Sequence, residues 1–186
     1  MSLPLLALTS PIQVGVAFVV RCKLGKPVIF RQQRSGLHGR TIDILKFRTM
    51  SLQVDSAGKP RPDDERITAI GMFLRSSSLD ELPNLLSVVK GDLSLVGPRP
   101  LLTDYLSAYS EMQFRRHEVL PGVTGWAQIH GRNTISWEQR FEFDVWYVDH
   151  LSLKLDLIVL WRTVIQAIGR RGVTAEGSVT MPPFTG

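Results

Sequence analysis

The first twenty residues are apolar or uncharged throughout, with Pro11 at the middle of the stretch. A straight helix of this length would rise about 30 Å, roughly the hydrocarbon thickness of a bilayer. Pro11 removes one backbone hydrogen bond from such a helix and disfavours helical angles at Ser10, whose hydroxyl could satisfy the freed carbonyl. The pattern therefore favours a kinked, re-entrant helix that dips into one leaflet, with Ser10 and Pro11 at the kink. A buried core helix of a soluble protein is the alternative.

Beyond this stretch the apolar pattern alternates between strand and helix periods. Residues 27–32 and 41–49 read as short strands, and the Gly-rich segment 35–39 between them predicts a turn, so we expect a β-hairpin. Residues 51–65 are polar and interrupted by Pro and Gly, which predicts an exposed loop. Helices are expected over about 66–76, 80–89, 103–118, 136–148 and 152–169. The last of these contains Lys154, Asp156 and Arg162, so it should belong to the core or lie at a membrane interface instead of spanning.

Composition fits one α+β, mostly helical domain of 186 residues, 44% of them hydrophobic, and the positive charge is unevenly placed. The formal net charge is +5, yet the segment 21–48 alone carries eight Lys or Arg residues against Asp43. Such a cluster directly after an apolar helix favours a membrane surface with anionic lipids. It also leaves open a non-enzymatic basic module that docks on anionic lipid or RNA. One cysteine and four scattered histidines provide no zinc spacing.

Two adjacent carboxylates, Asp80 and Glu81, stand among apolar residues in the segment 77–85. A carboxylate can bind Mg²⁺ or attack a phosphorus atom, and a helix N-terminus would keep the pair ionised. The same residues can be explained as helix caps. Ser78 with Glu81 fits a capping box, and Asp80 as N-cap would place Pro83 in the first turn. On this segment alone, capping is the favoured explanation.

Arginine and lysine recur in short motifs on both sides of the acids, and guanidinium groups grip phosphate oxygens bidentately. Taken singly, each could be a solvated surface residue. The expected phosphate-binding side chains are Lys46, Arg48, Arg75, Arg99 and Arg132. Neither a GxxxxGK[ST] loop nor a GxGxxG loop is present, which argues against P-loop and dinucleotide-binding folds.

In their order along the chain these motifs resemble one family, the small monotopic polyprenyl-phosphate phosphoglycosyl transferases, also called bacterial sugar transferases. Within it, the chain is similar to single-domain enzymes such as the Campylobacter enzyme that initiates protein N-glycosylation. The resemblance covers nearly the whole chain. Its motifs are Thr9-Ser-Pro11, Lys46-Phe-Arg-Thr-Met50, Arg75-Ser-Ser-Ser-Leu-Asp-Glu-Leu-Pro83, Lys90-Gly-Asp-Leu-Ser-Leu-Val-Gly-Pro-Arg-Pro-Leu-Leu102, Pro121-Gly-Val-Thr-Gly-Trp-Ala-Gln128, Gly131-Arg-Asn133, Ser136-Trp-Glu138 and Arg171-Gly-Val-Thr-Ala-Glu-Gly177.

The resemblance implies transfer of a sugar phosphate from a UDP-sugar to undecaprenyl phosphate, with release of UMP, as the first membrane step of bacterial glycoconjugate and polysaccharide biosynthesis. It implies that Asp80 is the nucleophile of a covalent aspartyl intermediate, that Glu81 is its partner, and that Mg²⁺ binds at both carboxylates. It further implies a re-entrant membrane helix over 1–24 and a catalytic domain over 25–186 on the cytoplasmic face of the bacterial inner membrane. Downstream glycosyltransferases are possible partners, and nucleic acid is not expected.

One departure concerns the N-terminus. The family pattern has a longer basic and apolar segment before the Ser-Pro kink, whereas nine residues precede Ser10 here. The first arm of the re-entrant helix is therefore expected to be short or missing. Two other enzymatic alternatives use the same residues: a Mg²⁺ phosphohydrolase of nucleotide sugars, and a ternary-complex transferase in which an acid acts as general base.

Overall fold

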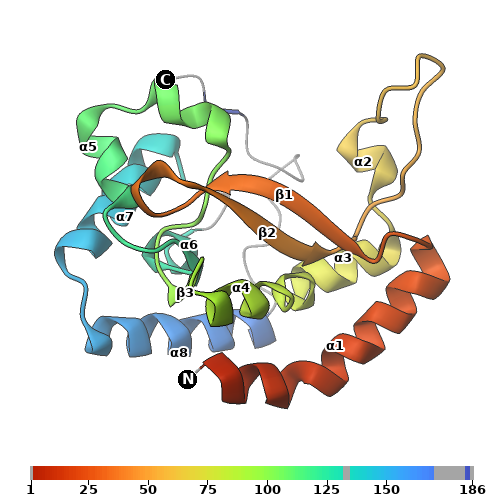
Figure 1. Cartoon of the computed structure of the whole chain (residues 1–186), viewed down its shortest axis with the longest axis horizontal. Helices are drawn as coiled ribbons and strands as arrows, with labels where there is room; N and C mark the ends of the chain where they lie inside the picture. Colours follow the sequence, from red (N-terminus) through yellow and green to blue (C-terminus); the bar gives the residue numbers. More distant parts are fainter. Residues whose placement is uncertain (1, 132–134, 170–182, 185–186) are drawn as a thin grey trace.

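The computed structural model describes residues 2–131, 135–169 and 183–184. Helices dominate it, and the strands form two small, separate sheets (Figure 1). The α-helices are α1 (Ser2–Leu24), α2 (Asp63–Arg66), α3 (Ala69–Ser76), α4 (Asn84–Lys90), α5 (Glu111–Phe114), α6 (Trp126–Ile129), α7 (Trp137–Asp149) and α8 (Leu153–Gly169). The strands are β1 (Ile29–Ser35), β2 (Thr41–Phe47), β3 (Ser94–Val96) and β4 (Gly122–Thr124). The 3₁₀ turns are η1 (Leu37–Gly39), η2 (Leu79–Glu81), η3 (Thr103–Ala108) and η4 (Arg115–His117). The predicted α+β, mostly helical class is confirmed.

Helix α1 contains Pro11 and continues past it. The proline deprives the carbonyl of Ala7 of its usual donor, and the Ser10 hydroxyl donates to that oxygen at 2.8 Å. Thr9 Oγ1 likewise donates to the carbonyl of Leu5 at 2.8 Å. This is the hydroxyl compensation expected from the sequence. By length and composition Leu3–Leu24 could cross a membrane, and the re-entrant arrangement stays a prediction.

The C-terminal half of α1 packs against the rest of the chain. Val20 is fully buried with Phe47 and Leu74, and the partly buried Leu79 and Leu82 join the same cluster. The residues on either side of the Asp80–Glu81 pair therefore share a hydrophobic core with the apolar helix. The N-terminal half of α1 instead exposes its large side chains, among them Leu3 and Leu8.

The predicted hairpin is present. Strands β1 and β2 pair antiparallel from Ile29 opposite Phe47 to Ser35 opposite Thr41. At its far end, Ser35 donates its backbone N–H to the carbonyl of Leu101 at 2.9 Å. The hairpin thus joins the core around α1 to the segment that follows Arg99.

A second sheet, not expected from the sequence, pairs β3 with β4 in parallel. Glycines allow this close pairing: a Cβ on Gly122 would lie 2.1 Å from the backbone nitrogen of Gly97, and a Cβ on Gly97 would lie 2.4 Å from the carbonyl oxygen of Leu120. No residue with a side chain fits either position without backbone movement. The Gly/Pro-rich stretches therefore do more than interrupt regular structure, because they permit two short strands to meet.

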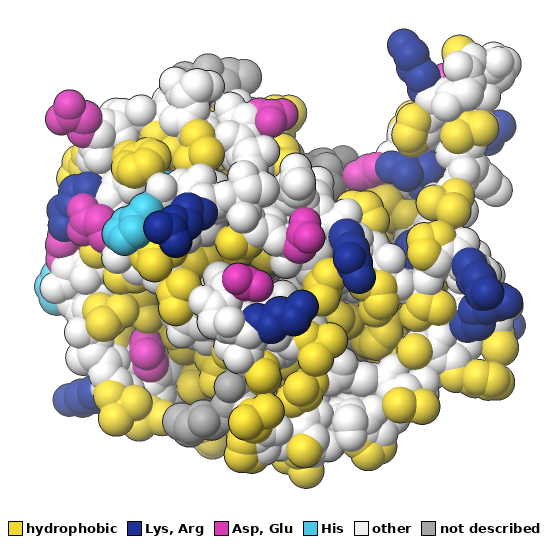
Figure 2. All heavy atoms as spheres, in the orientation of Figure 1, with side chains coloured by type: hydrophobic (Ala, Val, Ile, Leu, Met, Phe, Trp, Pro, Cys, Tyr) yellow, Lys and Arg dark blue, Asp and Glu magenta, His cyan; other side chains and the backbone are white. Residues whose placement is uncertain are grey.

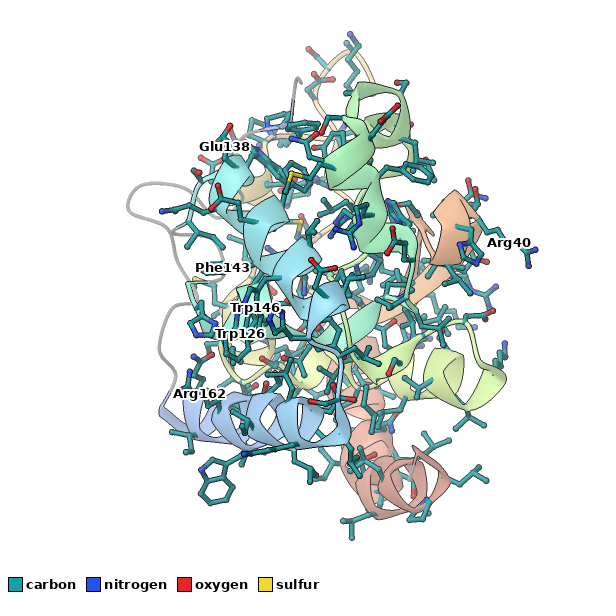
Figure 3. All side chains as sticks on the ribbon, turned by 90° about the vertical axis from the view of Figure 1, so that its left-hand side faces the viewer. Arg40, Trp126, Glu138, Phe143, Trp146 and Arg162 are labelled. Atoms are coloured by element: carbon teal, nitrogen blue, oxygen red, sulfur yellow. The ribbon has the colours of Figure 1, made fainter. Side chains whose placement is uncertain are left out.

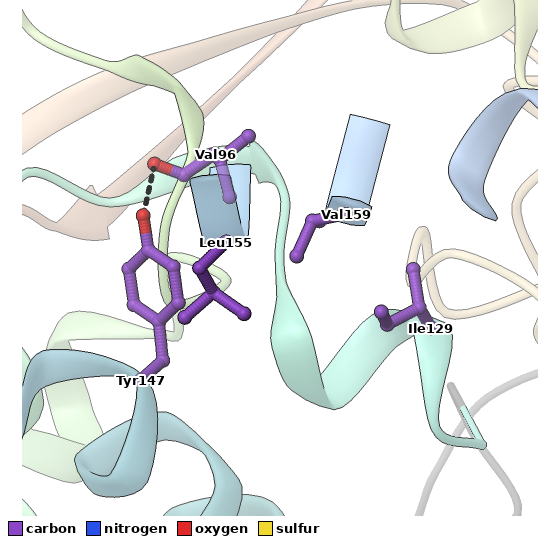
Figure 4. Packing of buried hydrophobic residues seen from close by; sticks show 5 residues of the cluster. All are labelled: Val96, Ile129, Tyr147, Leu155 and Val159. Carbon is purple, nitrogen blue, oxygen red and sulfur yellow. Dashed lines mark hydrogen bonds between the residues drawn. The ribbon is translucent and has the colours of Figure 1, made fainter. Parts of the chain in front are cut away.

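The core below this sheet is formed by Val96, Ile129, Tyr147, Leu155 and Val159 (Figure 4). The Tyr147 hydroxyl donates to the Val96 carbonyl at 3.4 Å and lies 2.7 Å from Asp156 Oδ1. The core joins β3, α6, α7 and α8. It fixes the start of the loop that carries Arg99.

Two expected helices differ in the structure. The helix predicted over 103–118 is divided into η3, α5 and η4, because Ser110 forms a capping box with Gln113 and starts a new helix there. The helix predicted over 80–89 is the turn η2 followed by α4, which begins after Pro83. Most of the loop predicted over 51–65 is confirmed, with α2 starting at Asp63.

Candidate active site

The acidic pair lies in the one-turn element η2, between α3 and α4. Ser78, just before it, has a left-handed backbone with φ of 58°, an unusual conformation for a residue other than glycine. After the pair, Asn84 accepts a hydrogen bond at 2.9 Å from the backbone N–H of Leu45, the neighbour of Lys46 in β2. The acids therefore lie on a short turn, and the residue that follows this turn by three positions is hydrogen-bonded to the hairpin.

The capping interpretation is wrong. Ser78 makes no side-chain cap hydrogen bond, and the N-cap position of α4 is occupied by Pro83, not by Asp80. The left-handed angles of Ser78 do not match the extended backbone that a capping serine adopts. Neither acid therefore acts as a cap or as part of a capping box.

Glu81 is paired with two cations from distant parts of the chain. Lys46 Nζ of β2 donates to Glu81 Oε1 at 2.7 Å, and Arg99 Nη2, after β3, donates to the same oxygen at 2.9 Å. Burial alone would raise the pKa of Glu81, but the charges of Arg99 and Lys46 outweigh burial and hold this pKa well below its usual range. Glu81 is therefore ionised, and its carboxylate fixes the positions of the Lys46 and Arg99 side chains.

The Asp80 carboxylate differs from that of Glu81 both in its hydrogen bonding and in the direction of its pKa shift. Its residue is 7% exposed, and among the described residues none donates a hydrogen bond to its carboxylate. Burial, and then the charge of Glu81, raise its pKa to about 6, against the opposing charges of Lys46, Arg75 and Arg99. The sequence-based expectation that a helix N-terminus keeps Asp80 ionised is corrected, because η2 is a single 3₁₀ turn and the shift is upward. Above about pH 6 the Asp80 carboxylate is ionised, and its oxygens accept no hydrogen bond from the described residues.

The other predicted cations are placed differently. Arg75 Nε donates to Thr49 Oγ1 at 3.0 Å; burial lowers the pKa of Arg75, and the Asp80 charge opposes this. Arg48 points to the end of α1, where its guanidinium donates to the carbonyls of Leu24 and Lys26. The structure therefore brings Lys46, Arg75 and Arg99 to the acids and leaves Arg48 away from them. Arg132, like the 171–177 motif, lies outside the described residues.

Behind Arg99 lies a buried ion pair that the sequence analysis missed. Arg116 Nη2 lies 2.7 Å from Asp144 Oδ2, with 1% of each side chain exposed, and the same nitrogen donates to the carbonyl of Arg99 at 2.7 Å. The Arg115-Arg116 doublet resembles surface charge in the sequence. No local signal in the sequence separates the buried Arg116 from its exposed neighbour Arg115.

The donor set fits Mg²⁺ only in combination with a substrate. The described residues contain no cluster of three or more His, Cys, Asp or Glu positioned for a metal. Mg²⁺, however, is commonly bound through one or two carboxylates together with substrate phosphates and water. Asp80 and Glu81 provide two adjacent carboxylates, which fits that mode of binding.

Comparison with known proteins identifies the family of this chain. The family model described as bacterial sugar transferase matches residues 1–170. The uncharacterized sugar transferase EpsL of Bacillus subtilis is 56% identical over 182 residues, which cover 98% of this chain and 90% of EpsL. The UDP-glucose:undecaprenyl-phosphate glucose-1-phosphate transferase of Escherichia coli is 38% identical over 87% of this chain but only 37% of its own length. The undecaprenyl-phosphate galactose phosphotransferase of Salmonella typhimurium is 36% identical over 92% of this chain and 39% of its own length. The chain is a member of the bacterial sugar transferase family.

Proposed function

We propose that this protein transfers a sugar phosphate from a UDP-sugar to undecaprenyl phosphate through a covalent intermediate on Asp80. The observation that carries the proposal is the contrast between the two acids. Glu81 is engaged by Lys46 and Arg99, whereas the Asp80 carboxylate accepts no hydrogen bond from the described residues. An unengaged carboxylate beside fixed cations is suited to attack a phosphorus atom. Relatives named for UDP-glucose and undecaprenyl phosphate support the choice of substrates.

The reaction then proceeds in two displacements. An Asp80 oxygen attacks the phosphorus that bears the sugar, the bond from this phosphorus to the bridging oxygen breaks, and UMP leaves. The phosphate oxygen of undecaprenyl phosphate next attacks the same phosphorus, and the bond to Asp80 breaks, which restores the carboxylate. Lys46, Arg75 and Arg99 lie where they can neutralise the charge on the phosphate oxygens. When bound, Mg²⁺ would be held by Asp80 and Glu81 and would polarise the diphosphate.

Intact-protein mass spectrometry tests the intermediate. Protein incubated with a panel of UDP-sugars and Mg²⁺, without acceptor, should gain the mass of one sugar phosphate and release an equivalent amount of UMP. Asp80→Asn should form no adduct, and Asp92→Asn, a change at an exposed acid, should form it normally. The panel also identifies the sugar.

Other results of the same assay support the alternatives. Turnover without any adduct, and only with both substrates present, would favour a ternary complex with an acid as general base. Sugar phosphate and UMP released without undecaprenyl phosphate would favour a phosphohydrolase. Salt-sensitive lipid or RNA binding that is indifferent to Asp80, with no turnover, would favour the basic module.

We further propose that the protein lies on the membrane through α1 and α8. Figure 2 shows hydrophobic side chains gathered along the edge where α1 lies, and Figure 1 places α8 along the same edge. Leu153, Leu157, Trp161 and Ile165 recur every fourth residue of α8 and are between 50% and 71% exposed. Lys154 and Arg162 flank this stripe, a pattern typical of helices that lie in the membrane interface. The opposite side of α8 buries Leu155 and Val159.

Three of the four tryptophans pack against other aromatic side chains. Trp126 and Trp146 stack on each other with ring centroids 4.6 Å apart, beside Phe143 and above Arg162 in Figure 3. Trp137 packs on Phe141. Trp161, at 67% exposure, is the tryptophan that contributes to the α8 stripe.

Replacing Trp161 and Ile165 by glutamate should weaken binding to vesicles of anionic phospholipid by at least about tenfold, because each apolar side chain contributes about 1.5–3 kcal/mol when buried. Co-sedimentation with vesicles measures the change. Leu52→Glu, a substitution of an exposed leucine in the loop before α2, is the matched control and should bind normally. Unchanged vesicle binding of the double variant would contradict the proposed role of α8.

A further inference from the structure

Arg34 on β1 is a half-buried cation that the proposed mechanism does not use. Its guanidinium donates to Gln32 Oε1 at 2.6 Å, and among the described residues it forms no ion pair with an acid. A guanidinium partly removed from water without a counter-charge is costly to the folded state. Its position therefore calls for an anion that the described residues do not supply.

The fold places Arg34 next to the segment that carries Arg99. The backbone N–H of Ser35 donates to the carbonyl of Leu101 at 2.9 Å, and the Ser35 hydroxyl donates to the same oxygen at 3.2 Å. Arg34 is close enough to Arg99 for the two positive charges to interact: burial, and then Arg99, lower the pKa of Arg34, and Tyr105 and Tyr109 oppose this. Arg34 of β1 and Arg99 of the loop after β3 are thus brought near each other by the hydrogen bonds between Ser35 and Leu101.

The charge of this region is positive. The carboxylate of Glu81 is shared by Lys46 and Arg99, so it cannot also neutralise Arg34. Such an excess of cations favours a ligand with more than one negative charge, and a diphosphate has this chemistry.

The position of Arg34 on the hairpin distinguishes between a lipid phosphate and a nucleotide phosphate as its ligand. Ile29, at the start of β1, belongs to the hydrophobic cluster around α1. Arg34 lies five residues further along, about 16 Å at the rise of a β-strand. Figure 1 shows this end of β1 near α5, away from α1. A lipid phosphate would approach from the side of α1, whereas a water-soluble nucleotide can reach the end of β1.

We propose that Arg34 contacts the phosphate of the UMP moiety of the UDP-sugar, on the side of Arg99 remote from α1. This inference rests on the proposed function and adds a nucleotide-binding residue to it. Asp80 and Glu81 then lie at the phosphorus that bears the sugar, and Arg34 binds the part of the donor that leaves. Arg34 is therefore expected to affect donor binding and not acceptor binding.

Steady-state kinetics and UMP binding test this assignment. Arg34→Ala should raise KM for the UDP-sugar, and weaken UMP binding measured by calorimetry, by about tenfold or more, the usual size for a lost charge-assisted contact. kcat and KM for undecaprenyl phosphate should stay within about twofold of wild type. Arg34→Lys should recover part of the affinity, and Arg31→Ala, a change at an exposed arginine on the same strand, should behave as wild type.

Each alternative outcome is decisive. Unchanged UMP affinity and donor KM in Arg34→Ala would overturn the assignment and leave the transferase function in place. A raised KM for undecaprenyl phosphate alone would also overturn it, because Arg34 would then contact the lipid phosphate. Wild-type protein that binds UMP through Arg34 but does not turn over UDP-sugar would overturn the proposed function only. Wild-type protein that neither binds UMP nor turns over UDP-sugar would overturn both.

Discussion

Replacing Asp80 by asparagine should reduce turnover by at least about 10³-fold, because the amide cannot attack phosphorus to form the covalent intermediate. The change is nearly isosteric, and the carboxylate accepts no hydrogen bond from the described residues, so the fold should remain intact. UMP release with both substrates present measures the activity, and circular dichroism checks the fold. Activity retained by this variant would contradict the assignment of Asp80 as nucleophile.

The same variant has an expected pH dependence of stability. The pKa of Asp80 is raised from its ordinary value of 3.8 to about 6, so the folded state binds this proton more tightly than the unfolded chain does. Ionised Asp80 therefore destabilises the fold, and this cost appears as the pH rises from about 4 to about 6. The advantage of Asp80→Asn over wild type should grow through that window and stay constant above it.

Thermal denaturation midpoints of the two proteins, measured in parallel from pH 4 to pH 8, test this dependence. Folded Glu81 stays ionised over this whole range, because Arg99 and Lys46 hold its pKa well below the usual value, so the difference between the two proteins reports mainly on Asp80. A stability difference independent of pH would contradict the raised pKa of Asp80. The expected pH-dependent difference would instead show that the Asp80 carboxylate is retained at a cost in stability, as is common for functional groups.

Truncation of either member of the buried pair Arg116–Asp144 to alanine should lower the free energy of unfolding by about 3–5 kcal/mol, because an unpaired charge is then left in the core. The double variant Arg116→Met/Asp144→Leu should recover most of that stability, since well-packed apolar residues often replace a buried pair without cost. It should not recover turnover, because the hydrogen bond from Arg116 to the carbonyl of Arg99 is gone.

Urea unfolding and UMP release separate these two effects. The exposed pair of Arg115 with Asp149 lies next to the buried one and is the matched control, and Arg115→Ala should change both quantities little. Full activity in the refolded double variant would show that Arg116 is only structural. If the double variant is as unstable as the single variants, lost packing, and not an unpaired charge, lowers the free energy of unfolding.

Short-range features could be predicted from the sequence. The acids, Lys46 and Arg99 each stand in a compact motif, and the hairpin follows from two strand-like segments around a Gly-rich turn. The start of a new helix after Ser110 could also have been predicted, since Ser110 with Gln113 has the spacing of a capping box.

Long-range features could not be predicted in this way. The pairing of β3 with β4 depends on two glycines far apart in the sequence, and Arg116 meets Asp144 across 28 residues. Arg48 stands in the same motif as Lys46, yet its side chain binds carbonyls at the end of α1. An arginine motif indicates affinity for oxygen atoms, and only tertiary packing decides whether those oxygens belong to a phosphate or to the backbone.

The hydrophobic cluster beneath the acids has a consequence for how the two substrates meet. Leu79 and Leu82, on either side of the pair, pack with Val20 of α1, and Arg48 ties the end of that helix to the hairpin. With α1 inserted in the membrane as proposed, the depth of this helix sets the height of Asp80 above the bilayer. A lipid phosphate is confined to the headgroup plane, so in the proposed reaction the depth of α1 determines whether Asp80 and the acceptor phosphate lie at the same height.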